Sequence, residues 1–290
     1  MLLQDGDDMK KRFLRYLVVL FLFSAVVLSA SCQRSGETLP GKSSPSSTKQ
    51  STVGKIVSTV GIYRPAESRF FLRFENGAGF GDVDIIFGSS GDMPIVGDWD
   101  GNGTTTVGVY RPSSSTFLFL NSNDPGVSPT TVQFGGKDGI PVVGDWDGNG
   151  TVTIGVYRPS DSTFLLRNSN TPGEPEITVK FGTSGDIPIA GDWDGNKSWT
   201  IGVYRPNTNT FLLRNSNTPG SPDITVQYGD KGDLPIVGDW DGDGTWTIGV
   251  FKPDSNVFGL RNSNQAGEPE IVFSYGSLGD KPLAGKWARD

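Results

Sequence analysis

A fixed 47-residue period, a high glycine content and two chain ends that complete each other predict an all-β fold, a closed five-bladed β-propeller. Tryptophan recurs once per period, and three further aromatic columns keep the same spacing. The periodic tryptophans are Trp99, Trp146, Trp193, Trp240 and Trp287. Glycine provides 40 of the 290 residues, about twice its average share, which favours turns over long helices. Because no repeat carries an insertion, near-identical modules must meet their neighbours in one geometry.

Each repeat contains four short extended runs that are separated by turn-forming sequences. Residues 140–146 and 151–157 flank the tight-turn sequence Asp147-Gly-Asn-Gly, which predicts a β-hairpin. Residues 163–167 and 177–181 follow after two segments rich in Pro, Ser and Asn. Such a four-stranded antiparallel meander is typical of a propeller blade. An open solenoid is the alternative, but it would need polar capping repeats at its ends.

The two ends of the repeat region supply what the other lacks. Residues 57–63 match residues 151–157, so the first repeat has no strand that carries tryptophan. Residues 282–287 contain only that strand. Joining the ends gives five complete blades, one of them with three N-terminal strands and one C-terminal strand, and it leaves no strand edge open at the closure. We expect the propeller to span residues 53–290.

The N-terminal region predicts export and a tether. Residues 9–15 carry four positive charges and precede an apolar run, residues 16–31, that is too short to cross a bilayer as a helix. Small residues precede the sole cysteine, Cys32, and this arrangement resembles a bacterial lipoprotein lipobox. The resemblance implies that residues 1–32 are a signal peptide ending in a lipidated Cys32, and that the protein is secreted and lipid-anchored to the bacterial membrane or cell surface. A plain signal peptide or a short anchor with an incidental thiol is the alternative. Residues 33–52 have the composition of a flexible spacer.

Composition excludes several functional classes. The chain has no histidine and one cysteine, which excludes Ser-His-Asp and Cys-His catalysis, His-ligated metals and intramolecular disulfides. The net charge of −7 and the pI of about 4.7 are opposite to the basic surface that phosphate backbones require. Nucleic acid is therefore not an expected partner.

The hairpin between the first two strands of four repeats has the residues of a cation-binding loop. Positions 1, 3 and 5 place oxygen-bearing side chains on alternate residues around a glycine-assisted bend, as Ca²⁺ requires, while positions 7 and 9 offer a carbonyl and a hydroxyl. The predicted metal ligands are Asp98, Asp100, Asn102, Thr104 and Thr106; Asp145, Asp147, Asn149, Thr151 and Thr153; Asp192, Asp194, Asn196, Ser198 and Thr200; and Asp239, Asp241, Asp243, Thr245 and Thr247. We call these four segments the Asp loops.

Together with Phe87-Gly88 and residues 108–112, the first Asp loop resembles the FG-GAP and VCBS repeat families, and the resemblance covers residues 53–290. It implies weak calcium sites within propeller blades. Position 9 is Thr where these families usually have an acid, so we expect affinities of about 10⁻⁴ to 10⁻³ M. The loop that begins at Asp239 has three carboxylates and is the strongest candidate. In the alternative interpretation, Asp and Asn cap the hairpins through local hydrogen bonds without metal.

Two further sets of residues are candidate ligand contacts. Blade topology places five cations on the face opposite the Asp loops, where they could hold a sugar or an acidic peptide. These cations are Arg64, Arg111, Arg158, Arg205 and Lys252. Inter-blade salt bridges to nearby aspartates are the alternative. Trp199 and Trp246 occupy a slot that holds Thr105 and Val152 in other repeats, so we expect them to be exposed stacking surfaces, whereas the periodic tryptophans should be core residues.

The function predicted from these features is a surface-tethered, non-enzymatic binding or adhesion module. We expect a monomer that recognises a glycan or a cell-surface protein through several weak, equivalent sites, with Ca²⁺ as its only cofactor. A glycoside hydrolase with two catalytic carboxylates is an alternative, although Glu67, Glu75 and Asp84 fall in no recognisable motif. A purely structural repeat domain is the third possibility.

Overall fold

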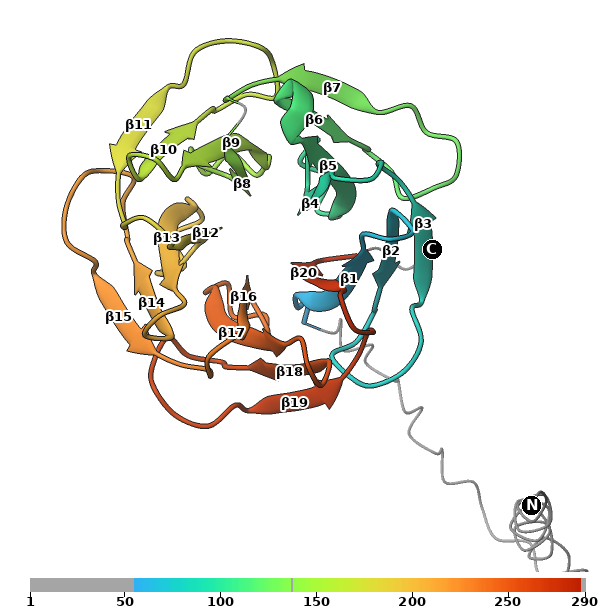
Figure 1. Ribbon diagram of the computed structural model, residues 1–290, viewed down its shortest axis with the longest axis vertical. Coiled ribbons are helices and arrows are strands. Elements are labelled where there is room, and N and C mark those ends of the chain that lie inside the picture. Colours follow the sequence, from blue (N-terminus) through green and yellow to red (C-terminus); the bar gives the residue numbers. More distant parts are fainter. Residues whose placement is uncertain (1–54, 137, 288–290) are drawn as a thin grey trace, which may run out of the picture. The chain divides into compact units, whose positions relative to one another are not determined.

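The computed structural model describes residues 55–136 and 138–287, which form five four-stranded antiparallel sheets arranged around one axis (Figure 1). The five-bladed β-propeller is thereby confirmed. Within the described ranges, the only helix is the short 3-10 turn η1 (Pro112–Ser114), and no helix is long and apolar enough to cross a membrane. The predicted signal peptide, Cys32 and the spacer lie outside the described residues.

From the axis outward, blade 1 consists of β20 (Lys281–Gly285), β1 (Thr59–Arg64), β2 (Arg69–Leu72) and β3 (Val83–Ile86). Blade 2 consists of β4 (Met93–Gly97), β5 (Thr106–Arg111), β6 (Thr116–Phe119) and β7 (Thr130–Gln133). Blade 3 consists of β8 (Ile140–Gly144), β9 (Thr153–Arg158), β10 (Thr163–Leu166) and β11 (Ile177–Lys180). Blade 4 consists of β12 (Ile187–Gly191), β13 (Thr200–Arg205), β14 (Thr210–Leu213) and β15 (Ile224–Gln227). Blade 5 consists of β16 (Leu234–Gly238), β17 (Thr247–Lys252), β18 (Val257–Leu260) and β19 (Ile271–Ser274).

Burial changes with distance from the axis. The second strand of each blade is rich in β-branched residues and is buried over five successive positions, because the sheets of neighbouring blades cover both of its faces. Four of the five outermost strands alternate between half-buried or buried and exposed residues, as β11 and β15 show. The five innermost strands lie beside one another and surround the axis (Figure 1).

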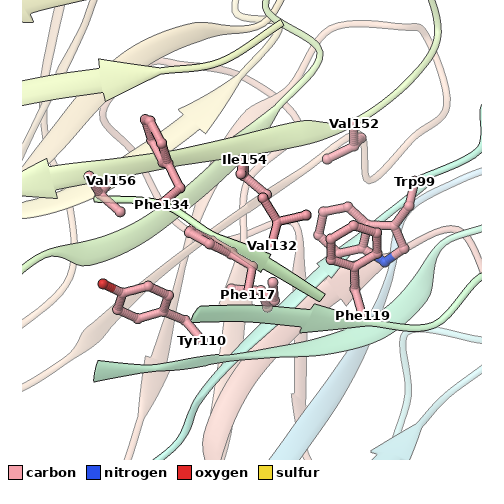
Figure 2. Close-up of a cluster of buried hydrophobic side chains, with 10 residues drawn as sticks. Trp99, Tyr110, Phe117, Phe119, Val132, Phe134, Val152, Ile154 and Val156 are labelled. Atoms are coloured by element: carbon pink, nitrogen blue, oxygen red, sulfur yellow. The ribbon is translucent and has the colours of Figure 1, made fainter. Parts of the chain in front are cut away.

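The core lies between the blades. Figure 2 shows one such layer, in which Tyr110, Phe117 and Trp99 from blade 2 face Ile154 and Val156 from blade 3. The Tyr110 and Phe117 ring centroids are 4.7 Å apart, and the equivalent pair has the same spacing in every blade. Because the aromatic residues recur every 47 residues, the same ring pair packs in the same way in each blade.

The periodic tryptophans are core residues, as predicted, with exposed fractions of 3–8%. Each indole packs against the glycine that ends the innermost strand of its blade. A Cβ on Gly97 would lie only 2.9 Å from the ring of Trp99, so this position admits glycine alone. This contact explains why tryptophan and the glycine two residues before it recur with the same period.

The ring closes as the chain ends predict. Strand β20 pairs with β1 in antiparallel register, with Leu283 opposite Gly61. A backbone hydrogen bond joins each pair of neighbouring blades near the Asp loops, including the two junctions that flank blade 1. These bonds run from Ser58 to Asp239, Thr105 to Lys286, Val152 to Asp98, Trp199 to Asp145 and Trp246 to Asp192, with N···O distances of 2.7–2.8 Å. The closing blade is thus joined to its neighbours in the same way as the others.

Candidate functional site

Three of the four Asp loops close on themselves. The Asp98 carboxylate accepts hydrogen bonds from the backbone N–H groups of Asn102, at 3.0 Å, and Gly103, at 2.7 Å. The Asn102 side-chain oxygen accepts a bond from the Thr104 N–H at 2.8 Å. The loops that begin at Asp145 and Asp192 repeat these contacts. Local hydrogen bonds therefore shape these hairpins, as the metal-free interpretation expects.

Burial raises the pKa of the first aspartate in each of these three loops above its ordinary value, while bonds from the loop amides act in the opposite direction. The second aspartate of the loop raises the pKa further through charge repulsion. The loops are therefore acidic turns in which one carboxylate is enclosed and the other faces water.

The fourth Asp loop has a different arrangement. The Asp239 side chain is 2% exposed, and its Oδ2 lies 3.1 Å from Nζ of Lys286. Its Oδ1 is buried and has no hydrogen-bond partner among the described residues. The Asp243 N–H bonds instead to Asp241 Oδ1, at 3.1 Å. Asp239, Asp241 and Asp243 each offer one carboxylate oxygen, all within 4.8 Å of one another, and hard oxygen donors of this kind suit Ca²⁺.

The threonines at position 9 do not lie in the loops, which corrects the expectation that their hydroxyls complete a cation site. They belong to the second strand of each blade and are buried, and each hydroxyl donates to a backbone carbonyl of the third strand's end. The Thr153 hydroxyl, for example, bonds to the Arg167 carbonyl oxygen at 2.7 Å. The same arrangement holds for Thr106, Thr200 and Thr247. Metal binding at positions 1 to 7 stays a prediction.

The cations on the opposite face form ion pairs within blades, whereas inter-blade bridges were the expected alternative to ligand binding. Arg111 Nε and Nη2 contact the two carboxylate oxygens of Asp92 at 2.9 and 2.8 Å. Asp92 precedes the innermost strand of the same blade, and antiparallel pairing brings it beside the end of the second strand. Equivalent pairs join Arg64 to Asp280, Arg205 to Asp186 and Lys252 to Asp233.

Arg158 is the exception in this ring of cations. Gly139 occupies the slot that holds an aspartate in the other blades, so Arg158 pairs instead with Asp161 at 2.7 Å. The Arg158 side chain is 45% exposed. The pairing lowers the pKa of Asp161 to about 2. Among the five predicted ligand contacts of this face, four are thus engaged with a buried aspartate, and the use of any of them by a ligand stays a prediction.

The aromatic periods do not reveal a second repeated feature, a column of buried arginines. Arg73, Arg167, Arg214 and Arg261 follow the third strand of four blades and are 5–8% exposed. Each holds the long loop that follows it: Arg214, for instance, bonds to Asp223 at 3.0 Å and to Ser216 Oγ at 3.0 Å. Blade 2 has Leu120 and Pro129 where the arginine and the acid would stand. A 47-residue search for charged columns would have found this pair.

The innermost strands enclose a cavity of about 470 Å³ on the axis. A proline near the start of each innermost strand contributes to its lining, as do small aliphatic residues two positions later. The prolines are Pro94, Pro141, Pro188, Pro235 and Pro282. The volume lies in the range of small-molecule sites, which are mostly apolar and carry few polar groups.

Trp199 and Trp246 line this cavity at the end where the Asp loops lie. Their ring centroids are 4.0 Å apart and the rings are tilted by 55°. Both side chains are half-buried, since Trp199 also packs on the core beside Trp146 and Trp246 on the core beside Trp193. The expectation of exposed stacking surfaces is therefore corrected to a half-buried aromatic pair. We call the cavity and this pair the axial site.

The acids that fell in no motif do not form a catalytic pair in the axial site. Asp84 bonds to Arg69 at 2.6 Å, and Glu75 bonds to Arg73 at 3.0 Å. Glu67 also lies within ion-pair distance of Arg64 and Arg69. None of these three acids lines the axial cavity. Each of these acids is paired with an arginine.

Comparison with known proteins does not assign the chain to a family. The chain matches no protein-family model and no curated protein, so its resemblance to FG-GAP and VCBS repeats stays a prediction. Among solved structures, it is similar to BBS1N in complex with ARL6DN, soaked with lead, at 10% identity and a TM-score of 0.37. The mercury-soaked form of that complex gives 8% and 0.35. In both cases the match covers 64% of this chain and 57% of the other. A likeness this weak assigns no partner.

Proposed function

We propose that this protein is a non-enzymatic ligand-binding module held outside the cytoplasm by a lipid on Cys32, and that its ligand enters the axial site. The observation that carries the proposal is the pair of Trp199 and Trp246 at one end of the axial cavity. Sister blades have Ser58, Thr105 and Val152 at the equivalent positions, so the aromatic surface occurs once in the ring. One asymmetric site supports recognition on the axis in place of five equivalent weak sites.

The ligand is expected to be a small molecule or a projecting group of a larger one, such as a glycan end or a protein side chain. The cavity volume of about 470 Å³ sets this limit. The ion pairs of the opposite face argue against that face as the main site, because a ligand would have to displace buried aspartates from their partners.

A ligand screen tests this function. The full chain carrying Cys32→Ser would be titrated with soluble glycans and small molecules while its melting temperature and tryptophan fluorescence are measured. A ligand of the axial site should stabilise the wild type and have no effect on the variant Trp199→Val with Trp246→Thr. These replacements are residues that the fold already holds at the same position in blades 3 and 2. Stabilisation that persists in the double variant would place the site elsewhere, and release of reducing sugar from a glycan would favour the hydrolase.

Calcium binding at the fourth Asp loop is a second proposal, favoured by a specific observation. Asp239, Asp241 and Asp243 fit a hard divalent cation, since their carboxylates converge and one buried oxygen of Asp239 lacks a partner. Bound Ca²⁺ would supply positive charge where three carboxylates meet. The other three Asp loops have Asn at position 5 and satisfy their enclosed carboxylate with loop amides, so they are weaker candidates.

A further inference from the structure

The charge around the axial site is mainly negative. The four Asp loops carry nine carboxylates and one lysine, Lys197. Within the described part of the chain, Asp100, Asp147 and Asp194 are exposed and form no salt bridge, whereas the aspartates beside the cations of the opposite face are paired. Two other cations lie nearby: Lys286 is held by Asp239 at 3.1 Å, and the exposed Lys55 lies beside Gly242 of the fourth Asp loop. Unpaired charge of one sign around a cavity raises the local concentration of ligands of the opposite sign.

No cation–π contact engages the aromatic pair among the described residues. Indole is the aromatic side chain that attracts cations most strongly through its face. The cation–π contacts found among the described residues involve Phe71 and Tyr275, and neither of these lines the axial cavity. No arginine or lysine of the described ranges therefore occupies the faces of Trp199 and Trp246.

Four polar side chains that line the cavity are already engaged in hydrogen bonds. The Thr105 hydroxyl accepts a bond from the Lys286 N–H at 2.9 Å, and the Ser58 hydroxyl accepts one from the Asp239 N–H at 3.0 Å. The Asp98 and Asp145 carboxylates accept bonds from their own loops. The site thus offers aromatic surface, aliphatic surface and negative potential more readily than hydrogen-bonding groups. Such a combination favours a cation with an apolar shell over a sugar, whose hydroxyls need hydrogen-bond partners.

Resting on the proposed function of the axial site, we infer that its ligand is a small organic ammonium ion, quaternary or alkylated, whose charged group lies against Trp199 and Trp246. The Asp loops attract the ion and the aromatic pair holds it. Anionic ligands are disfavoured by the same loops.

Isothermal titration of the full chain with choline and with its neutral isostere, 3,3-dimethylbutan-1-ol, tests this inference. The two probes have nearly the same shape, so a difference in affinity reports the charge. We expect choline to bind at least about tenfold more tightly than the alcohol, with an affinity that falls as salt is added. Phosphocholine, which adds an anionic group, should bind more weakly than choline.

Two variants locate the effect. Trp199→Val with Trp246→Thr should abolish choline binding, while Asp100→Asn, Asp147→Asn and Asp194→Asn combined should weaken choline by about three- to tenfold without changing the alcohol. Melting curves establish that both variants are folded. If choline and the alcohol bind equally and the tryptophan variant loses both, the ligand need not be a cation, and the inference is wrong. The axial site itself would then still be supported. Failure of choline to bind, or binding that survives the tryptophan variant, would overturn the inference, and the ligand screen then decides separately on the proposed function.

Discussion

The ammonium of Lys286 lies 3.1 Å from the Asp239 carboxylate, which joins the C-terminal end of blade 1 to the Asp loop of blade 5. The two residues occupy the same kind of position in neighbouring copies of the repeat, 47 residues apart. This ion pair provides the cation for a carboxylate that is otherwise enclosed, and it does so at a junction that closes the ring.

Removal of the lysine should destabilise the protein. Lys286→Gln leaves the buried Asp239 carboxylate without its cation, and we expect a loss of about 1–2 kcal/mol in the free energy of unfolding, less than for a fully buried pair because Lys286 is partly exposed. Urea unfolding measures this. Lys197→Gln, a change of the exposed lysine in the third Asp loop, is the matched control and should have little effect. Equal stability of the two variants would contradict a structural role for the pair.

Calcium should stabilise the fold through the fourth Asp loop alone. With a dissociation constant of about 1 mM, about 10 mM Ca²⁺ would add about 1.4 kcal/mol to the free energy of unfolding. Thermal melts in calcium and in chelator measure the shift. Asp241→Asn with Asp243→Asn should abolish it, whereas Asp147→Asn in the second loop should not. A shift that is absent in the wild type, or equally lost in the control, would rule out this site.

The buried arginines should tolerate leucine better than alanine. Arg214→Leu introduces the residue that blade 2 has as Leu120, and we expect a loss of about 1 kcal/mol, because leucine keeps the apolar packing and the Asp223 carboxylate left without its partner is 41% exposed. Arg214→Ala removes packing as well and should cost about 2–3 kcal/mol. The reverse change, Leu120→Arg, buries a charge without an acid and should cost more than about 3 kcal/mol, with partial recovery when Pro129→Glu is added. Denaturant midpoints of the four variants check the order, and the absence of recovery would contradict the pairing of these two columns.

Acidification should favour the folded state at the three self-capped Asp loops. Burial raises the pKa of Asp98, Asp145 and Asp192, so the folded protein retains protons that the unfolded chain releases. The contribution of these groups to stability therefore increases as the pH falls from about 7 through the range just above the ordinary pKa of aspartate. Asp98→Asn removes one of these titrations. Urea midpoints at the two ends of this range measure the effect. The stability of the wild type relative to Asp98→Asn should be greater at the lower pH, and a smaller relative stability there would contradict the raised pKa.

Periodicity predicts more of the fold than of the site. The columns of Trp99 and Tyr110 predict blades, ring closure and core, because every copy obeys the same packing rule. Local sequence also explains why Arg158 departs from its ring, since Gly139 removes its partner. It could not place the Asp239 carboxylate, whose cation comes from a different repeat. The strand expected over residues 151–157 already includes Thr153, but the sequence could not show that its hydroxyl bonds to the Arg167 carbonyl oxygen.

Local sequence could not predict that Trp199 and Trp246 are half-buried either. Each indole packs on the core of its surroundings and also reaches the axis, and both facts depend on how adjacent blades meet. Their shared departure from Ser58, Thr105 and Val152 was visible in the sequence, and it indicated the place of the site although not its shape.

The axial site is the central claim, and the indole N–H signals of the seven tryptophans test it most directly. A titration of the ¹⁵N-labelled full chain carrying Cys32→Ser with choline should move the signals of Trp199 and Trp246 and leave the five buried tryptophans in place. Assignment by single Trp→Phe variants identifies each signal. Shifts confined to the buried five would contradict a ligand on the axis that contacts this pair, and no shift at saturating choline would contradict an organic ammonium as that ligand.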